Sequence, residues 1–186
     1  MKNRYVFGYG SLVNRKTHDY SSLSPAKLPG WRRVWRHVEG RKVAFLTVEN
    51  DANSAIDGLV AAVPDVAWEA LDERESSYIS ETAKDLSHSL PTTSDIRFYH
   101  APKHLQIHSD NPKPILLSYI DVVVQGFLHE LGEDSVSRFF DTTFGWEAPI
   151  LNDRENPIYP RHQSLSDAET ALVDFHLSKL NVVIEN

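Results

Sequence analysis

The apolar positions of the chain fall into short runs separated by glycine, proline and asparagine, a pattern typical of strands joined by turns. The first run, Arg4–Phe7, is β-branched and aromatic, and it leads directly into the turn-forming sequence Gly8–Ser11. A second run, Trp31–His37, alternates so that its two tryptophans and Arg33 would share one face of a strand. Both runs therefore predict strands.

Four more segments in the middle of the chain are rich in residues that favour strands. Residues 43–48 and 56–63 flank the polar sequence Asn50–Asn53, which predicts a hairpin with a polar loop. Asp95–His100 and Ile115–Val124 predict two further strands. Helices interrupt these strands without the rhythm of parallel βαβ units, so we expect a mostly antiparallel sheet.

Helical patterns lie between and after these strands. One helix is expected to begin at Asp65, a residue type that caps helix N-termini, and to end within Glu75–Tyr78. Val136 and Phe139-Phe140 have helical spacing, which predicts a second helix that ends before Gly145.

The last part of the chain predicts a loop and a helix. Trp146–Gln163 is rich in proline, asparagine and arginine and is expected to be an ordered loop. Ser166–Glu169 is a capping box, which predicts a final helix that reaches about Leu180. Because no internal repeat or linker interrupts the chain, we expect a single domain over residues 1–186, with 146–186 appended. The expected fold class is α+β, with a small, mixed, mostly antiparallel β-barrel or sheet and flanking helices.

Composition narrows the class of protein. The chain has 186 residues, of which 41% are hydrophobic and 10% aromatic, and it has no cysteine. It can therefore build a core, whereas a disulfide scaffold, a cysteine-ligated metal site and a cysteine nucleophile are excluded. No apolar run approaches the roughly 18 residues needed to cross a bilayer. With a net charge of −7, we expect a cytoplasmic protein that binds neither nucleic acid nor membranes.

The turn Gly8–Ser11 is the first candidate for chemistry. Its two glycines permit positive φ, and successive backbone N–H groups can then converge on a carboxylate or an oxyanion. The alternative is an ordinary turn at the end of a strand. The turn is not a nucleophile elbow, because Val13 stands where that motif needs glycine, and no Gly-Lys-Ser/Thr follows to make a phosphate-binding loop.

The helix that begins at residue 65 offers a second candidate, Glu75. Leu71, Glu75 and Tyr78 fall on one apolar stripe of this helix. Glu69 and Glu73 fall on another face and are expected to be solvated. Partial burial and the negative end of the helix dipole would both raise the pKa of Glu75, the direction that a general base needs. The alternative is an ion pair between Glu75 and a nearby arginine.

Two further clusters are better explained by structure than by function. The basic and aromatic segment Trp31–His37 could stack nucleic-acid bases, but its alternation fits a strand of an acidic protein equally well. His100, His104 and His108 recur every fourth residue, as metal ligands can. Pro102 interrupts any helix that would carry all three, so we expect an exposed polar loop and no metal site.

Three segments together resemble the γ-glutamylcyclotransferase superfamily, and most closely its ChaC-like branch. Val6–Leu12 is similar to the family's N-terminal substrate loop, and Arg32–Trp35 to an Arg-Arg-aromatic-Trp stretch downstream of it. Leu71–Glu75 is similar to a Leu-Asp-x-Arg-Glu run that ends in the catalytic acid/base. Ser118–Ile120 more weakly resembles a strand that carries a pocket tyrosine. The resemblance implies a small mixed β-barrel with flanking helices, in agreement with the α+β class.

The chain departs from the ChaC-like pattern at three places. Asn14 stands where that branch commonly has tryptophan, and Ser76–Tyr78 stands where it usually has Gly-Gly-Tyr. Trp146–Arg161 does not match the pattern of the glutathione-degrading enzymes. The resemblance therefore leaves open whether the substrate is glutathione, and whether Trp146–Arg161 covers the site or simply packs.

The resemblance also implies a reaction in which the substrate supplies the nucleophile. The α-amino group of a γ-glutamyl compound attacks its own γ-carbonyl, which releases 5-oxoproline and an amine without a metal or an organic cofactor. The alternatives are a same-fold enzyme that cleaves a γ-glutamylamine, a non-catalytic domain that binds a small acidic metabolite and, least favoured, a nucleic-acid module. The implied site residues are Glu75 as catalytic acid and base, and Gly8, Tyr9, Gly10, Ser11, Leu12 and Tyr119 as substrate-binding residues.

Overall fold

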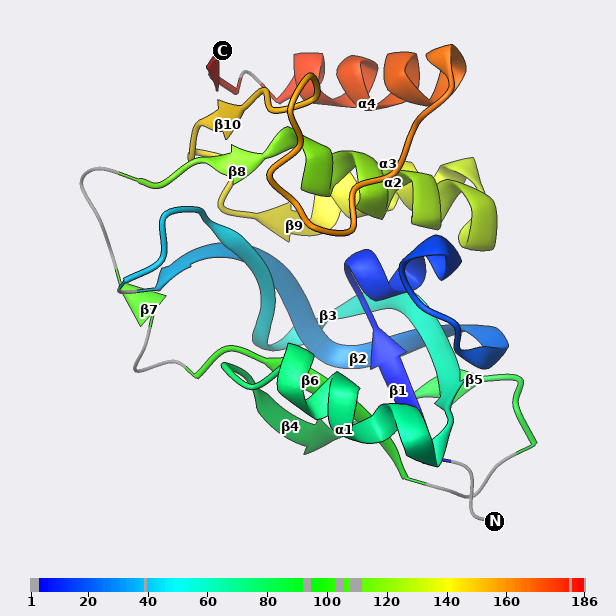
Figure 1. Cartoon of the computed structure of the whole chain (residues 1–186). Helices are drawn as coiled ribbons and strands as arrows, with labels where there is room; N and C mark the ends of the chain where they lie inside the picture. Colours follow the sequence, from blue (N-terminus) through cyan, green and yellow to red (C-terminus); the bar gives the residue numbers. More distant parts are fainter. Residues whose placement is uncertain are drawn as a thin grey trace.

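The computed structural model describes residues 4–38, 40–91, 95–102, 106–107, 112–180 and 182–185. In Figure 1, α2, α3 and α4 lie above the long strands β2 and β3, and α1 lies below them. In chain order the elements are β1 (Arg4–Gly8), the 3₁₀ helices η1 (Ser11–Val13) and η2 (Arg15–Thr17), β2 (Ser21–Val38), β3 (Phe45–Val63), α1 (Asp65–Arg74), β4 (Ile79–Thr82), β5 (Ser87–His88), β6 (Ile96–His100), β7 (Gln106–Ile107), β8 (Ile115–Leu116), α2 (Leu117–Leu131), α3 (Glu133–Thr142), β9 (Thr143–Phe144), β10 (Ile150–Leu151), α4 (Asp167–Lys179) and β11 (Ile184–Glu185).

The main sheet is built on β2 and β3, which pair with each other along most of their length. Its strand order is β4-β6-β1-β3-β2-β5, and β7 and β9 also pair with β2. Most neighbours are antiparallel, whereas β1–β6 and β2–β9 are parallel. Over the described residues the end strands β4 and β5 do not pair, so the sheet is open. The predicted α+β class is confirmed, and of the two predicted forms the structure has the sheet rather than the barrel.

The predicted hairpin of residues 43–48 and 56–63 is wrong, because residues 45–48 and 56–63 belong to the single strand β3. The polar residues 51–54 between them form a bulge opposite Gly30 of β2, where the pairing register shifts. Gly30 has a φ of +79°, a conformation that favours glycine. The polar sequence therefore bends one strand instead of connecting two, and the true partner of β3 is β2.

The segment Ile115–Val124, predicted as a strand, is mostly helical. Only Ile115–Leu116 is a strand, and α2 begins at Leu117. An apolar run without periodicity does not distinguish a buried strand from a buried helix, and the β-branched residues of this run favoured the strand. Nearly all of α2 up to Phe127 is buried, because α2 packs against β3, α3 and α4.

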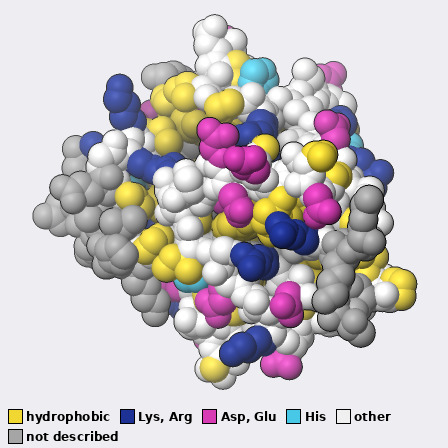
Figure 2. Space-filling view, turned by 60° about the horizontal axis from the view of Figure 1, so that its bottom comes forward, with side chains coloured by type: hydrophobic (Ala, Val, Ile, Leu, Met, Phe, Trp, Pro, Cys, Tyr) yellow, Lys and Arg dark blue, Asp and Glu magenta, His cyan; other side chains and the backbone are white. Residues whose placement is uncertain are grey.

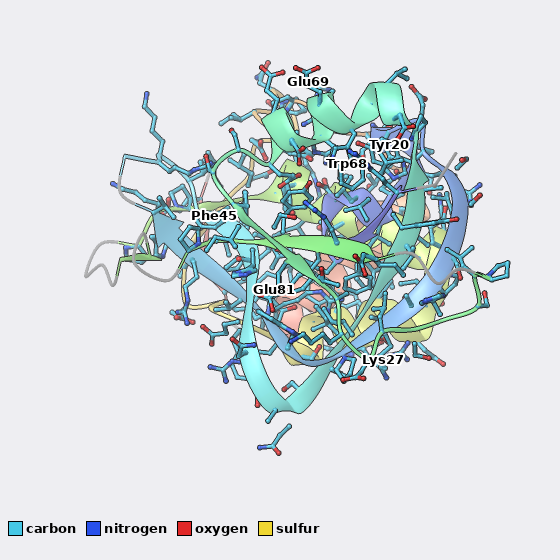
Figure 3. All side chains as sticks on the ribbon, turned by 90° about the horizontal axis from the view of Figure 1, so that it is seen from below. Tyr20, Lys27, Phe45, Trp68, Glu69 and Glu81 are labelled. Carbon is cyan, nitrogen blue, oxygen red and sulfur yellow. The ribbon has the colours of Figure 1, made fainter. Side chains whose placement is uncertain are left out.

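Helix α1 presents the side that its apolar stripe predicted, although its cap is a different residue and it ends at Arg74, just before the predicted end within Glu75–Tyr78. Pro64 is the N-cap and Asp65 is the first helical residue, where its carboxylate still complements the positive end of the helix dipole. Viewed from below, Trp68 lies on the side toward the sheet and Glu69 points away from it (Figure 3). Glu69 and Glu73 are both exposed, as predicted.

The remaining two helix predictions are confirmed. Val136, Phe139 and Phe140 of α3 are all buried. At the start of α4, Ser166 Oγ accepts a hydrogen bond from the backbone N–H of Glu169 (3.3 Å), and Glu169 Oε2 accepts one from the Ser166 N–H (2.7 Å). No helix within the described residues is long and apolar enough to cross a membrane.

The core between the sheet and the upper helices contains the charged side chain of Arg33. It is 1% exposed, and its guanidinium lies 4.9 Å from the ring centroid of Phe127 and 5.6 Å from that of Phe139. Its Nε donates to the carbonyl oxygen of Tyr9 (2.9 Å), and its Nη2 donates to that of Asp57. Burial lowers the pKa of Arg33 to about 10, although it remains a cation at neutral pH. Arg33 therefore ties the backbone just after β1 to the core.

Arg33→Ala is expected to lower the free energy of unfolding by about 3 kcal/mol or more, because it leaves a cavity and two unsatisfied carbonyls. Arg32→Ala is the matched control, since the neighbouring Arg32 is one-third exposed and pairs with Glu49 on the other face. That substitution should cost about 1 kcal/mol or less. Urea unfolding of both variants checks the difference, and equal costs would contradict the role given to Arg33.

Candidate functional site

A cavity of about 370 Å³ lies where the exit of β1, the end of α1 and the loop before α4 meet. Its wall combines the glycine turn, several aromatic rings, three arginines and one carboxylate. The lining residues are Phe7, Gly8, Tyr9, Gly10, Ser11, Leu12, Arg41, Val43, Ala44, Phe45, Leu46, Arg74, Glu75, Tyr78, Tyr99, Leu116, Tyr119, Ile158, Tyr159, Pro160 and Arg161.

The glycine turn leads from β1 into η1, and neither Gly8 nor Gly10 has room for a side chain. A Cβ atom on Gly8 would lie 2.5 Å from Cβ of Leu12, and one on Gly10 would lie 2.7 Å from the hydroxyl oxygen of Tyr119. Neither glycine has a positive φ, so the left-handed conformation expected for this turn is not present. The glycines are required instead because the backbone passes very close to neighbouring atoms.

Glu75 directly follows α1 as its C-cap residue, and its side chain is 15% exposed. Burial raises the pKa of Glu75 above its ordinary value, while the charges of Arg74, Arg161 and Arg41 act in the opposite direction. Oε1 of Glu75 lies 3.3 Å from Nε of Arg74. The ion pair that we considered as the alternative to a catalytic role is therefore present, and the raised pKa that a general base needs is present with it.

Arg74 connects Glu75 to the glycine turn. Its Nη2 donates to Ser11 Oγ (3.2 Å), while its Nε faces the carboxylate of Glu75. The Arg74 side chain is only 11% exposed. One largely buried guanidinium thus contacts both the carboxylate and the turn. Arg74 lies inside the motif Leu71–Glu75, but nothing in that motif predicts this contact.

Tyrosines form much of the remaining wall. Tyr119 lies on α2, not on a strand as expected, and its ring packs edge-to-face against Trp35 (5.8 Å) and Tyr159 (4.9 Å). The Tyr9 hydroxyl donates to the carbonyl oxygen of Tyr99 (2.6 Å). Burial raises the pKa of both Tyr9 and Tyr119, so these hydroxyls stay protonated at neutral pH. This part of the wall is therefore aromatic, and the hydroxyls of Tyr9 and Tyr119 are neutral.

One side of the cavity is covered by the segment Ile158–Arg161, here called the covering segment. In Figure 1 the orange loop that contains it descends from the level of α4 toward the blue helices η1 and η2. Nε2 of Gln163, just after this segment, donates to the carbonyl oxygen of Lys16 in η2 (3.5 Å). The sequence left open whether Trp146–Arg161 covers the site or simply packs. In the structure the end of this segment, Ile158–Arg161, covers the site.

The structure brings all of the site residues proposed from the sequence into this one cavity, and their roles remain predictions. Arg41, Arg161 and Tyr159 also line the cavity, although they belong to none of the motifs found in the sequence. Arg161 and Tyr159 come from a loop far along the chain, so only the fold reveals that they belong here. The proposed residues in question are Glu75, Gly8, Tyr9, Gly10, Ser11, Leu12 and Tyr119.

The basic and aromatic segment Trp31–His37 does not form an exposed stacking surface. Its tryptophans and Arg33 are buried on one face of β2, as the alternation predicted. Arg32 and Arg36 both pair with Glu49, at 2.5 and 2.7 Å. Acidic and basic side chains are also mixed across the face shown in Figure 2.

The histidine cluster is only partly described. His100 lies in β6 rather than in an exposed loop, where it approaches Glu81 (3.2 Å) and packs against the rings of Trp31 and Phe98. His104 and His108 lie outside the described residues. Within the described part of the chain, no group of three or more histidine or acidic side chains is arranged to hold a metal ion.

Replacing Arg74 tests the electrostatics of the cavity. Because the charge of Arg74 favours ionised Glu75, Arg74→Gln is expected to raise the pKa of Glu75 further. NMR titration of ¹³C-labelled glutamate side chains measures this pKa directly. Arg97→Gln, an exposed change on β6, is the control and should leave Glu75 unaffected. An unchanged or lowered pKa in Arg74→Gln would contradict the geometry described for this pair.

Comparison with known proteins identifies the fold. No protein-family sequence model matches the chain, and a search of curated proteins finds no match. Among solved structures it is similar to a gamma-glutamyl cyclotransferase, with a TM-score of 0.62, 15% identity, and 94% of this chain and 99% of that chain covered. It is also similar to human uncharacterized protein loc79017, with a TM-score of 0.60, 14% identity, and coverage of 94% and 99%.

A third similar structure is YkqA from Bacillus subtilis, with a TM-score of 0.58 and 15% identity. The match covers 78% of this chain and 57% of YkqA. Identities this low establish the fold and not the activity. The chain has the gamma-glutamyl cyclotransferase fold.

Proposed function

We propose that this chain is a γ-glutamylcyclotransferase, an enzyme that releases 5-oxoproline from a γ-glutamyl compound. The observation that carries the proposal is the position of Glu75, a mostly buried carboxylate with a raised pKa in the same cavity as the glycine turn. The fold supports it. We treat residues 1–186 as one domain, because the main cluster of buried hydrophobic residues has members from Tyr5 to Leu177.

In the proposed reaction the substrate attacks itself. Glu75 takes a proton from the α-ammonium group, and the freed nitrogen bonds to the γ-carbonyl carbon. The attacking nitrogen, which now carries a positive charge, gives up a second proton to become the lactam N–H. As the bond from the carbon to the leaving nitrogen breaks, Glu75 returns the first proton to that nitrogen and the amine takes up the second, so that 5-oxoproline and the protonated amine result. A carboxylate with a raised pKa suits both transfers. Holding the glutamyl chain folded gives effective molarities of about 10⁵ M or more.

The remaining groups of the cavity bind and orient the glutamyl unit in this proposal. We assign its α-carboxylate to the turn Tyr9–Leu12 and the adjacent guanidinium of Arg74, whose charge complements it. The neutral hydroxyl of Tyr119, beside Gly10, is placed to donate to the oxyanion that develops on the γ-carbonyl. The ring of Tyr159 limits the access of water.

The proposal is tested by incubating the purified chain with glutathione, several γ-glutamyl amino acids and several γ-glutamylamines. Mass spectrometry then measures 5-oxoproline, which we expect from at least one class, and the reacting class identifies the leaving group. Glu75→Gln is expected to lower the rate by at least about 100-fold, because its amide cannot exchange the proton. Its circular dichroism spectrum should be unchanged.

Glu73→Gln is the matched control, since Glu73 is an exposed carboxylate on the same helix. Its rate should stay within about twofold of the unaltered chain. If no compound yields 5-oxoproline, the proposed function is wrong. If a folded Glu75→Gln variant keeps near-normal turnover, the function can stand but Glu75 does not carry it.

A further inference from the structure

One buried carboxylate, that of Asp153, is hydrogen-bonded to two separate parts of the cavity wall. Asp153 is 6% exposed and follows β10. Its Oδ1 accepts from the backbone N–H of Ser118 (2.8 Å), and its Oδ2 accepts from Ser118 Oγ (2.6 Å) and from the backbone N–H of Ile158 (2.8 Å). Three donors satisfy a carboxylate that burial would otherwise make costly.

The first attachment is to the start of α2. Ser118 is the second residue of this helix, and the N-cap residue Leu116 offers no side-chain acceptor to the first turn. Asp153 supplies that acceptor from a distant part of the chain, and its negative charge lies at the positive end of the helix dipole. The next residue on the helix is Tyr119, which lines the cavity.

The second attachment is to the start of the covering segment. Ile158 N–H is bound by Asp153, and the residues that follow, including Tyr159, line the cavity. The rings of Tyr119 and Tyr159 then meet edge-to-face, with centroids 4.9 Å apart. The two tyrosines are 40 residues apart in the sequence, yet the residue before each is hydrogen-bonded to the same carboxylate.

The backbone around Asp153 is itself anchored. The adjacent Arg154 donates to both carboxylate oxygens of Asp121 on α2 (2.8 and 2.7 Å) and to Asp174 on α4 (2.8 Å). On the other side, β10 pairs with β8, the strand that leads into α2. The ion pairs of Arg154 on one side and the pairing of β10 with β8 on the other therefore fix the backbone at Asp153. Its hydrogen bonds can then hold α2 and the covering segment in a defined relative position.

We propose that Asp153 is a positioning residue of this site, one that sets Tyr119 and the covering segment against each other across the cavity. Its effect on the covering segment follows from the contacts alone, whereas its effect on turnover rests on the proposed function. Because Glu75 is attached elsewhere, loss of the bond from Asp153 to the covering segment alone should weaken substrate binding more than the proton transfers.

Asp153→Asn is the sharpest test, because it preserves shape and removes one acceptor oxygen. The amide oxygen can still accept from the Ser118 N–H, and the Ser118 hydroxyl can reverse its role. The Ile158 N–H, however, then faces an NH₂ group and loses its acceptor. By NMR, amide hydrogen exchange at Ile158 and Tyr159 should rise by at least about 10-fold, without a matching rise in β1 or β3. KM should rise by about 10-fold, with kcat changed less than about threefold.

Asp174→Asn is the matched control, because it removes a neighbouring, half-exposed partner of Arg154 without touching Ser118 or Ile158. Both its exchange at Ile158 and its KM should stay close to those of the unaltered chain. Exchange at Ile158 that does not rise in Asp153→Asn, or that rises equally throughout the molecule, would overturn the proposal, as would a fall in kcat with unchanged KM.

If Asp153→Asn does not fold, the variant Ser118→Ala tests the role of Asp153 instead. It removes only one of the three hydrogen bonds and should still raise exchange at Ile158, by a smaller factor, because the shared carboxylate is less firmly held. Unchanged exchange at Ile158 would then overturn the proposal. If the unaltered chain converts no γ-glutamyl compound, the proposed function fails, and the exchange measurements alone decide the role of Asp153.

Discussion

The geometry of the cavity depends on the buried guanidinium of Arg33. This cation lies beside the rings of Phe127 and Phe139 and donates to two carbonyl oxygens, one of which belongs to Tyr9 in the glycine turn. A buried charge restricts the positions of its hydrogen-bond partners. If a movement breaks these hydrogen bonds, the free-energy cost of removing the charge from water is no longer compensated. The turn is therefore fixed to the core of the sheet, and with it the spacing to Tyr119.

A second set of buried polar contacts joins the C-terminal part of the chain to the same turn. Asn14, 1% exposed, donates to the carbonyl of Val122 (2.9 Å) and to Gln125 Oε1 (3.0 Å) on α2. Gln125 in turn donates to the carbonyl of Ser164 (3.1 Å) and to Glu169 (3.2 Å). The asparagine that departs from the ChaC-like pattern thus takes part in a network from η1 through α2 to α4, so the segment expected to be appended helps to hold the site.

The sequence predicted what short-range patterns determine and missed what depends on distant contacts. The capping box at Ser166, the helical spacing around Phe139 and the stripe that turns Glu75 inward were all readable, because each depends on neighbours within a few turns. The run that became α2 was not, since an all-apolar segment takes its structure from what surrounds it. Nor could the sequence assign Arg161 to the site, because only the folded loop brings it beside the cavity.

The proposed function requires Glu75 to face the α-amino group of a glutamyl unit held by the glycine turn. A crystal structure of the Glu75→Gln variant with a γ-glutamyl compound bound tests this most directly. In this complex we expect the α-nitrogen to lie within hydrogen-bonding reach of residue 75, about 2.6–3.2 Å, and close to the γ-carbonyl carbon of the same molecule. A glutamyl unit bound with its α-nitrogen turned away from residue 75, or bound outside the cavity, would contradict the account.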